Sequence, residues 1–176
     1  PRHLLRLGTG EKDLVGNEDF TRVGRVNYSL ACRLELLQQV QGLGQALGVP
    51  GDVGSSCETG SYFYQEHIKP RLDRFMSITT NDEIFNPDTF PFKASFPDVQ
   101  TIEQAQVCAA QIQKLFDELS EYRAFELLRT QKHRADYILM KQARIVAMTC
   151  THAALTRDRL VELGFRYDSL IMEEAA

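Results

Sequence analysis

The expected fold is decided by residues 145–172, IVAMTCTHAALTRDRLVELGFRYDSLIM. Ile145–Met148 is a continuous apolar run, which is typical of a strand buried on both faces. Ala153–Leu163 has helical spacing and is ended by Gly164, and Ser169–Met172 has the pattern of a second strand. The inner side of the helix is expected to carry Leu155, Leu160 and Leu163. Strand, helix and strand in this order predict a βαβ unit with two parallel strands.

A further strand and a long helical block are expected before this unit. Leu4–Leu7 is the strand candidate, and a polar loop over residues 8–18 follows it. The first helix is indicated by apolar residues at steps of three and four, and Gly48 and Pro50 end it. Its expected buried face comprises Val26, Leu30, Leu34, Leu37, Val40, Leu43 and Leu47.

Two more helices are indicated by capping boxes, in which a hydroxyl side chain precedes an acid or amide by three residues. Ser55 with Glu58 opens the first of these helices, in which Pro70 predicts a kink or an end. Thr101 with Gln104 opens the longest helix. Its expected buried face comprises Ala105, Cys108, Ile112, Leu115, Leu119, Tyr122, Phe125 and Leu128.

Prolines and phenylalanines alternate over residues 77–100, between the second and third helices. Prolines cannot donate ladder hydrogen bonds, whereas phenylalanines need burial. We expect a loop that its aromatic rings hold against the helices; a loop that binds a partner is the alternative.

These patterns predict an α/β fold in which a mainly helical insertion interrupts a parallel sheet. The expected division is residues 1–19 and 143–176 for the sheet domain and residues 20–142 for the insertion. The apolar segments at both ends of the chain suggest an internal piece of a longer protein.

The composition excludes several classes of protein. A net charge of −4 and 43% hydrophobic residues argue against a disordered chain and against nucleic-acid binding through bulk positive charge. No apolar run approaches the roughly 20 residues that cross a bilayer, so no membrane contact is expected. The four cysteines are too dispersed for a zinc site, and a reducing compartment is the natural environment.

Two groups of residues could carry chemistry. Glu173 and Glu174 follow an expected strand, where ligands bind in open α/β sheets, although a solvated acidic turn would have the same sequence. Thr149, Thr151 and His152 lie between a strand and a helix, where hydroxyls and free N–H groups suit a phosphate oxygen. The alternative for Thr149 is an ordinary helix cap. Cys150 with His152 lacks a third orienting group, which argues against a catalytic dyad.

The string AMTCTHAAL, followed at a distance by LIMEEAA, resembles the Upf1-like superfamily 1 helicases. In that group a Thr-Cys motif at a strand end precedes the Walker B motif. Further strings resemble the spliceosomal, intron-binding branch of the group: GRVNY at residues 24–28, LGVPGD at 47–52 and CET at 57–59.

The resemblance implies a partial RecA-like fold, the first domain of an ATP-dependent RNA helicase. It implies that Glu174 activates water for ATP hydrolysis and that Glu173, at a position that most relatives fill with Asp, helps to hold Mg²⁺. Both glutamates would serve the ATP site, while Thr149, Thr151 and His152 would contact RNA. The implied partners are single-stranded RNA, here the intron of a pre-mRNA, and spliceosomal proteins in the nucleus.

The phosphate-binding Gly-x-x-x-x-Gly-Lys-Thr/Ser loop and a second RecA-like domain are absent from the sequence, so the segment is not expected to hydrolyse ATP alone. The longer Glu173 side chain also allows a second interpretation, a scaffold that docks on a ribonucleoprotein and hydrolyses ATP slowly or not at all.

Overall fold

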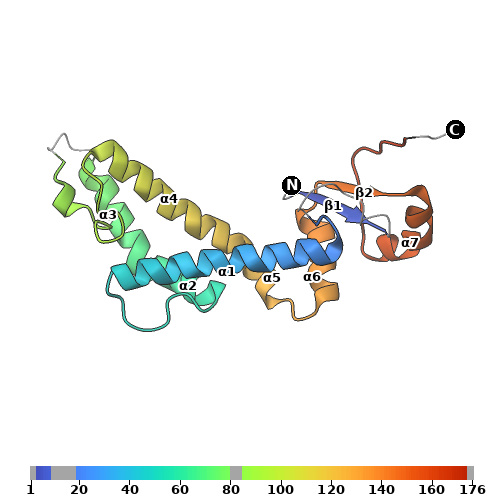
Figure 1. Cartoon of the computed structure of the whole chain (residues 1–176), viewed down its shortest axis with the longest axis horizontal. Helices are drawn as coiled ribbons and strands as arrows, with labels where there is room; N and C mark the ends of the chain where they lie inside the picture. The colour runs from blue at the N-terminus through green and yellow to red at the C-terminus, as the bar shows by residue number, and fades with distance from the viewer. Residues whose placement is uncertain (1–2, 9–18, 80–84, 174–176) are drawn as a thin grey trace. The chain divides into compact units, whose positions relative to one another are not determined.

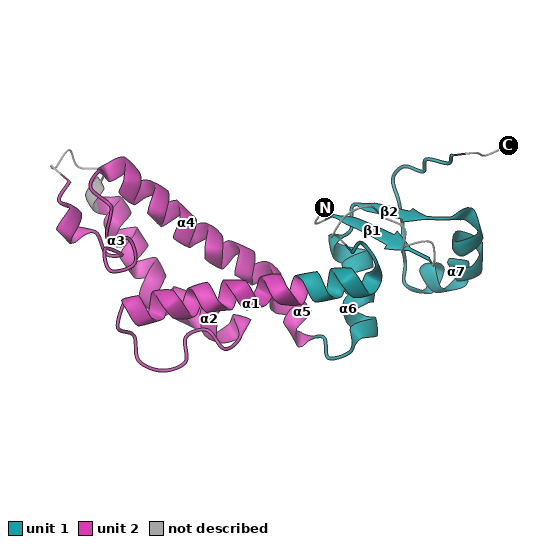
Figure 2. Ribbon diagram, viewed as in Figure 1, with its two compact units in different colours: residues 1–28, 128–176 teal, residues 29–127 magenta. Residues whose placement is uncertain are grey.

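The computed structural model describes residues 3–8, 19–79 and 85–173 of the 176-residue chain. Their contacts divide the chain into two compact units, coloured separately in Figure 2. We call residues 1–28 with 128–176 the sheet unit, and residues 29–127 the helical unit. The boundaries between the units fall inside the insertion expected at residues 20–142.

The first helix was predicted correctly. It is α1 (Arg22–Ala46), the blue helix of Figure 1, which begins in the sheet unit and continues into the helical unit (Figure 2). The Thr21 hydroxyl starts it by accepting a hydrogen bond from the Gly24 N–H at 2.9 Å. Val26, Val40 and Leu43 are buried as expected, but Leu34 is 55% exposed, so the buried face is narrower than predicted.

The other elements of the helical unit are mainly helices. They are α2 (Cys57–Phe63), the π-turn η1 (Tyr64–Ile68), α3 (Lys69–Thr79), the 3₁₀ turn η2 (Pro87–Thr89), α4 (Ile102–Glu121) and α5 (Arg123–Leu127).

One of the two predicted capping boxes is displaced. The box of Thr101 and Gln104 opens α4 as expected. The box of Ser55 and Glu58 was wrong: Ser56 caps α2, with Thr59 as its partner. The reason is Asp52, whose carboxylate accepts the N–H of Ser55 at 2.9 Å and also bonds its hydroxyl. Ser55 is therefore held in the preceding turn, and the helix begins one residue later.

Pro70 does not end its helix. Residues 57–79 continue through η1, in which the Lys69 N–H bonds the carbonyl of Tyr64, five residues back. A π-turn is one of the local adjustments that take up an irregularity in a helix. Pro70 then falls in the first turn of α3, where its missing N–H is tolerated.

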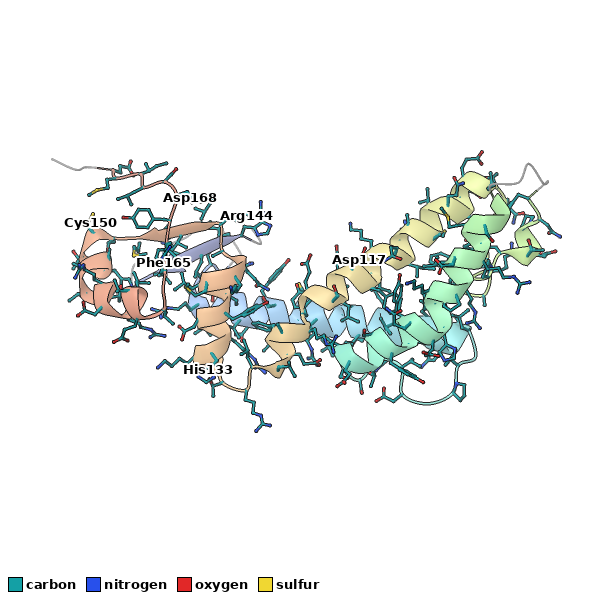
Figure 3. All side chains as sticks on the ribbon, turned by 180° about the vertical axis from the view of Figure 1, so that it is seen from behind. Asp117, His133, Arg144, Cys150, Phe165 and Asp168 are labelled. Carbon is teal, nitrogen blue, oxygen red and sulfur yellow. The ribbon has the colours of Figure 1, made fainter. Side chains whose placement is uncertain are left out.

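Aromatic rings pack between the helices of the helical unit; Figure 3 draws the described side chains as sticks. The ring of Phe116 on α4 lies 4.9 Å from that of Tyr64 and 6.1 Å from that of Phe63. In the proline-rich segment, the rings of Phe90 and Phe92 are buried, and the Phe90 ring lies 5.3 Å from that of Phe75 on α3. The expectation of a loop held by its rings is confirmed at Phe90 and Phe92.

A partly buried ion pair joins three helices of this unit. The Glu126 carboxylate on α5 pairs with Arg33 on α1 and accepts the N–H of Cys57, at the start of α2, at 2.8 Å. Burial, together with the nearby Glu126 charge, raises the pKa of the Cys57 thiol to about 11. Cys57 therefore stays protonated at neutral pH and behaves as a small core residue.

The sheet unit contains two parallel strands. Strand β1 (Leu4–Leu7) pairs with β2 (Ile145–Met148), with Leu4 opposite Ile145 and Leu7 opposite Met148. The unit also contains α6 (Gln131–Tyr137), the π-turn η3 (Ile138–Gln142) and α7 (Cys150–Glu162). Its fully or nearly fully buried side chains include Leu5, Leu7, Val26, Ala135, Ile138 and Leu139.

The predicted βαβ unit is wrong in its second strand. Ser169–Met172 forms no strand, and Ile171 is 94% exposed. A strand must bury enough surface to offset the entropy of ordering it, and among the described residues nothing covers this segment. The expected pairing of residues 145–148 with 169–172 is replaced by the pairing of β2 with β1.

Two burial predictions also fail, because no described residues cover the side chains concerned. Strand β2 was expected to be buried on both faces, but Ile145 is 62% exposed. Leu155 was expected on the inner side of its helix, α7, but it is 82% exposed. The fold is thus mostly helical with a two-stranded parallel sheet, which is compatible with the α/β class. Within the described ranges, no helix has the length and apolar character needed to span a membrane.

The packing of α2 against α4 yields a stability prediction. Phe63→Ala should lower the free energy of unfolding by about 3–5 kcal/mol, because this side chain is 1% exposed and its removal leaves a cavity. Tyr62→Ala is the matched control, since Tyr62 is 68% exposed and should change stability by less than about 1 kcal/mol. Urea denaturation measures both; equal losses would contradict the described packing.

Candidate functional site

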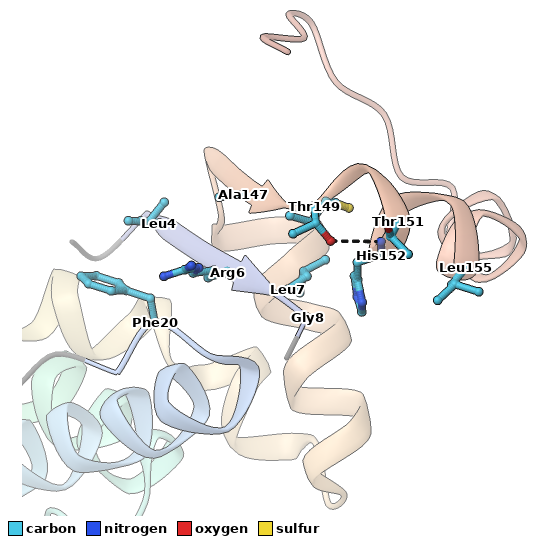
Figure 4. Close-up of a pocket in the computed structure, with 11 residues that line it drawn as sticks. Leu4, Arg6, Leu7, Gly8, Phe20, Ala147, Thr149, Thr151, His152 and Leu155 are labelled. Carbon is cyan, nitrogen blue, oxygen red and sulfur yellow. Dashed lines mark hydrogen bonds between the residues drawn. The ribbon is translucent and has the colours of Figure 1, made fainter. Parts of the chain in front are cut away.

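A pocket of about 620 Å³ lies at the carboxyl ends of β1 and β2 (Figure 4). Strand β1 contributes Leu4, Arg6 and Leu7, and the strand end of β2 contributes Ala147 and Met148. The start of α7 and the loops nearby supply Thr149, Thr151, His152, Leu155, Gly8 and Phe20. The pocket therefore occupies the edge of the sheet where parallel strands present their ligands.

Thr149 is the N-cap of α7, as one of the two interpretations expected. Its Oγ1 accepts the N–H of His152 at 3.2 Å, and its backbone is extended. The hydroxyl hydrogen of Thr149 remains available, because capping uses only the acceptor side of the oxygen. Capping and anion binding are therefore compatible at this residue.

The lining of the pocket is suited to an anion. The described lining residues include Arg6 and His152 but neither Asp nor Glu. Thr149 and Thr151 are exposed, so their hydroxyls can reach a ligand. The first N–H groups of α7 have no helical partner, and the positive end of the helix dipole lies here. Together these groups can hold a phosphate without a dense basic patch.

His152 lies against the loop that follows β1. A Cβ placed on Gly8 would sit 3.4 Å from the His152 ring, and Gly8 has a φ of +114°. The backbone conformation favours glycine at this position, while the distance to the ring is that of ordinary contact. The Nε2 atom of His152 is buried and has no hydrogen-bond partner among the described residues. His152 thus forms part of the pocket wall, while the two threonines are its accessible polar groups.

An ion pair fixes α7 to α6. Arg159 donates from Nη2 to Asp136 Oδ1 on α6 at 2.6 Å, and within α7 the Thr156 hydroxyl donates to the carbonyl of His152 at 2.7 Å. Asp136 is mostly buried in this pair, so the pair is less screened than one at the open surface. The helix start that carries Thr149 and Thr151 is therefore anchored to its own unit.

Of the two glutamates predicted to form the acidic site, the structure describes only Glu173. Glu173 is exposed, in a bend at the end of the irregular segment after α7, and Glu174 lies outside the described residues. Within the described ranges, no three His, Cys, Asp or Glu side chains come close enough to hold a metal ion. The described residues thus do not by themselves form a Mg²⁺ site. Cys150, at the start of α7, is exposed.

Eight of the eleven lining residues were not predicted as site residues from the sequence, among them Arg6, Gly8 and Phe20. Their presence depends on the pairing of β1 with β2, which no local pattern shows. The signal that could have indicated them is the apolar Leu4–Leu7 strand, whose carboxyl end must meet that of any parallel partner.

Comparison with known proteins gives two relatives. The chain is 45% identical to RNA helicase aquarius of Mus musculus, over 99% of the chain and 13% of the relative. It is 27% identical to pre-mRNA-splicing factor cwf11 of Schizosaccharomyces pombe, over 97% of the chain and 14% of the relative. The chain thus spans about one seventh of either relative. No protein-family model matches the chain.

The contact between Gly8 and His152 can be tested by substitution. Gly8→Ala should destabilise the sheet unit by about 1–3 kcal/mol, because a φ of +114° is strained for alanine and the added Cβ lies against the His152 ring at 3.4 Å. Gly164→Ala is the control, since Gly164 has a φ of +73° but no atom within 4 Å of its added Cβ. Thermal unfolding should show the larger loss for Gly8→Ala; a larger loss for Gly164→Ala would contradict the described contact.

Proposed function

The chain is similar to Aquarius over 99% of its length, and from this we propose that it is a segment of an RNA helicase acting in pre-mRNA splicing. The resemblance noted in the sequence and the similarity to cwf11 support the same proposal. Because the chain spans a small part of these relatives, the activity proposed is that of the intact protein.

The proposal for RNA binding rests on the pocket at the carboxyl ends of β1 and β2, which we call the sheet-edge pocket. Single-stranded nucleic acid binds where positive charge and hydroxyls meet the backbone and an aromatic ring offers a stacking surface. The pocket combines Arg6, Thr149 and Thr151 with the ring of Phe20, and no carboxylate occurs among its described lining residues. We propose that Thr149 and Thr151 hold an RNA phosphate and that His152 shapes the wall beside them.

Contacts of this kind do not read sequence, because every nucleotide presents the same phosphate. This property suits a protein that must bind introns of different sequence in a pre-mRNA. The same proposal implies that the intact protein is nuclear and binds spliceosomal proteins. The RecA-like domain would comprise residues 1–19 and 143–176, with residues 20–142 as its insertion.

ATP and Mg²⁺ enter the proposal through the resemblance in the last residues of the chain. Glu174 is proposed to activate water and Glu173 to help hold Mg²⁺, with both glutamates at the nucleotide site. The nucleotide would supply the free energy for closing and reopening the helicase on RNA. The chain's own contribution is one wall of that site.

A scaffold without a required ATPase is the second candidate. The observation that favours it is the placement of Glu173, which is exposed and belongs to no group of three possible metal ligands among the described residues. A scaffold would retain RNA binding at the pocket and dock on a ribonucleoprotein.

The two candidates predict different results for Glu174→Gln in the intact protein. A helicase should lose its RNA-stimulated ATPase while keeping RNA affinity within about threefold, because the amide cannot accept a proton. Glu162→Gln, on the exposed side of α7, is the matched control. Unchanged ATP turnover in Glu174→Gln would refute the catalytic assignment. Loss of turnover without loss of splicing would favour the scaffold.

RNA binding at the pocket can be tested in the intact protein by Arg6→Gln combined with Thr151→Ala. Affinity for single-stranded RNA should fall roughly tenfold or more, equally for different sequences. The slope of log affinity against log salt concentration should decrease by about one, as expected for the loss of one phosphate contact. Fluorescence anisotropy over a range of salt concentrations measures both effects. Arg166→Gln removes an exposed charge that does not line the pocket and should have little effect. An equal loss of affinity in both variants would exclude the pocket as the RNA-binding site.

A further inference from the structure

The helical stretch formed by α6 and η3 carries a run of basic residues that the sheet-edge pocket does not use. Residues 129–144 contain five Lys and Arg residues and a single acidic residue, Asp136. The Asp136 carboxylate pairs with Arg159 of α7, so it does not neutralise the cations of its own segment. The segment therefore presents charge of one sign.

Burial divides this segment into two sides. Ala135, Ile138 and Leu139 are buried and belong to the core of the sheet unit. The exposed residues are all polar or basic, and we call them the α6 surface: Arg129, Thr130, Gln131, Lys132, His133, Lys141 and Arg144. In Figure 3, His133 and Arg144 are labelled toward the two ends of the stretch, so the surface follows its whole length.

Four cations of the α6 surface are available to a ligand. Arg129, Lys132, Lys141 and Arg144 make no ion pair with any described residue. The 12 residues of the helical stretch between them extend over roughly 18 Å at 1.5 Å per residue. Unpaired charges of one sign along such a length attract an extended polyanion rather than a single small anion.

The residue types of the α6 surface favour nucleic acid over protein as that polyanion. The centre of a protein–protein interface is rich in apolar and aromatic side chains and poor in lysine. Contacts to phosphate and sugar are instead made by Lys and Arg together with Thr, Gln and other polar side chains. The α6 surface has this second composition and contains no exposed apolar side chain.

We propose that the α6 surface binds the phosphate backbone of RNA as a second contact, separate from the sheet-edge pocket. This inference rests on the proposal that the intact protein binds RNA. None of the seven residues lines the pocket, so both contacts can hold different nucleotides of one strand at the same time. The α6 surface adds affinity without sequence preference, because its charges reach only the phosphates.

The test is Lys132→Gln combined with Lys141→Gln in the intact protein, measured by fluorescence anisotropy with long single-stranded RNA. Affinity should fall on the order of fivefold, equally for different sequences. The slope of log affinity against log salt concentration should decrease by about 1.4, because each lost phosphate contact to a single strand contributes about 0.7. Both side chains are exposed, so the melting temperature should stay the same.

The matched control is Lys69→Gln combined with Arg74→Gln, which removes two exposed cations from α3 in the helical unit. This control should change neither the affinity nor the slope, and equal losses in the two double variants would overturn the inference. Normal affinity in Lys132→Gln with Lys141→Gln would also overturn it. If the pocket variant still lost affinity in that case, the proposed function would stand. An intact protein without RNA affinity would instead refute the proposed function itself.

Photo-crosslinking identifies the ligand of the α6 surface directly. A benzophenone amino acid replaces Gln131, an exposed residue in the first turn of α6, in the intact protein within its native assembly. Mass spectrometry should find it crosslinked to nucleotides. Crosslinks to a protein segment alone would show that the surface binds protein and would overturn the inference.

Discussion

The pairing of β1 with β2 is the constraint on which the candidate site depends. It joins residues 4–7 to residues 145–148, which lie far apart in the sequence. The His3 carbonyl accepts the N–H groups of Arg144 and Ile145 at 2.8 and 3.0 Å, so the register is fixed at the first pair. Because parallel strands end at one edge, the loop after β1 meets the loop after β2, and the pocket forms between them.

Local sequence patterns predicted helices and their caps better than they predicted strand pairing and burial. The spacing of Val26, Val40 and Leu43 and the Thr101 box located α1 and α4, because helix periodicity and capping are properties of neighbouring residues. Thr149 and Thr151 were correctly placed at a strand-to-helix junction. The strand over Ser169–Met172 failed because a strand is stabilised by a partner and by cover on its faces, and neither is encoded in its own residues. For the same reason Arg6 and Phe20 could not be assigned to the pocket.

The two units differ in net charge, which the net charge of −4 for the whole chain does not show. The sheet unit has more basic than acidic residues, and the helical unit has more acidic than basic residues. The sheet unit therefore carries an excess of basic residues in a chain whose overall composition argues against binding nucleic acid through bulk charge. The chain is similar to Aquarius over 99% of its length, and the RNA contact that we propose for the sheet-edge pocket lies in the unit with the excess of basic residues.

The π-turn at Tyr64–Ile68 acts as a phase adjustment within one continuous helical stretch. It lets α2 present Phe63 to α4 while α3 presents Phe75 to Phe90. A π-turn uses about one residue more than an α-turn for nearly the same rotation, so a one-residue deletion inside Tyr64–Ile68 can be absorbed by a return to α-helical geometry. A deletion within α2 or α3 instead rotates one set of apolar side chains by roughly 100° relative to the other, so it should be tolerated less well.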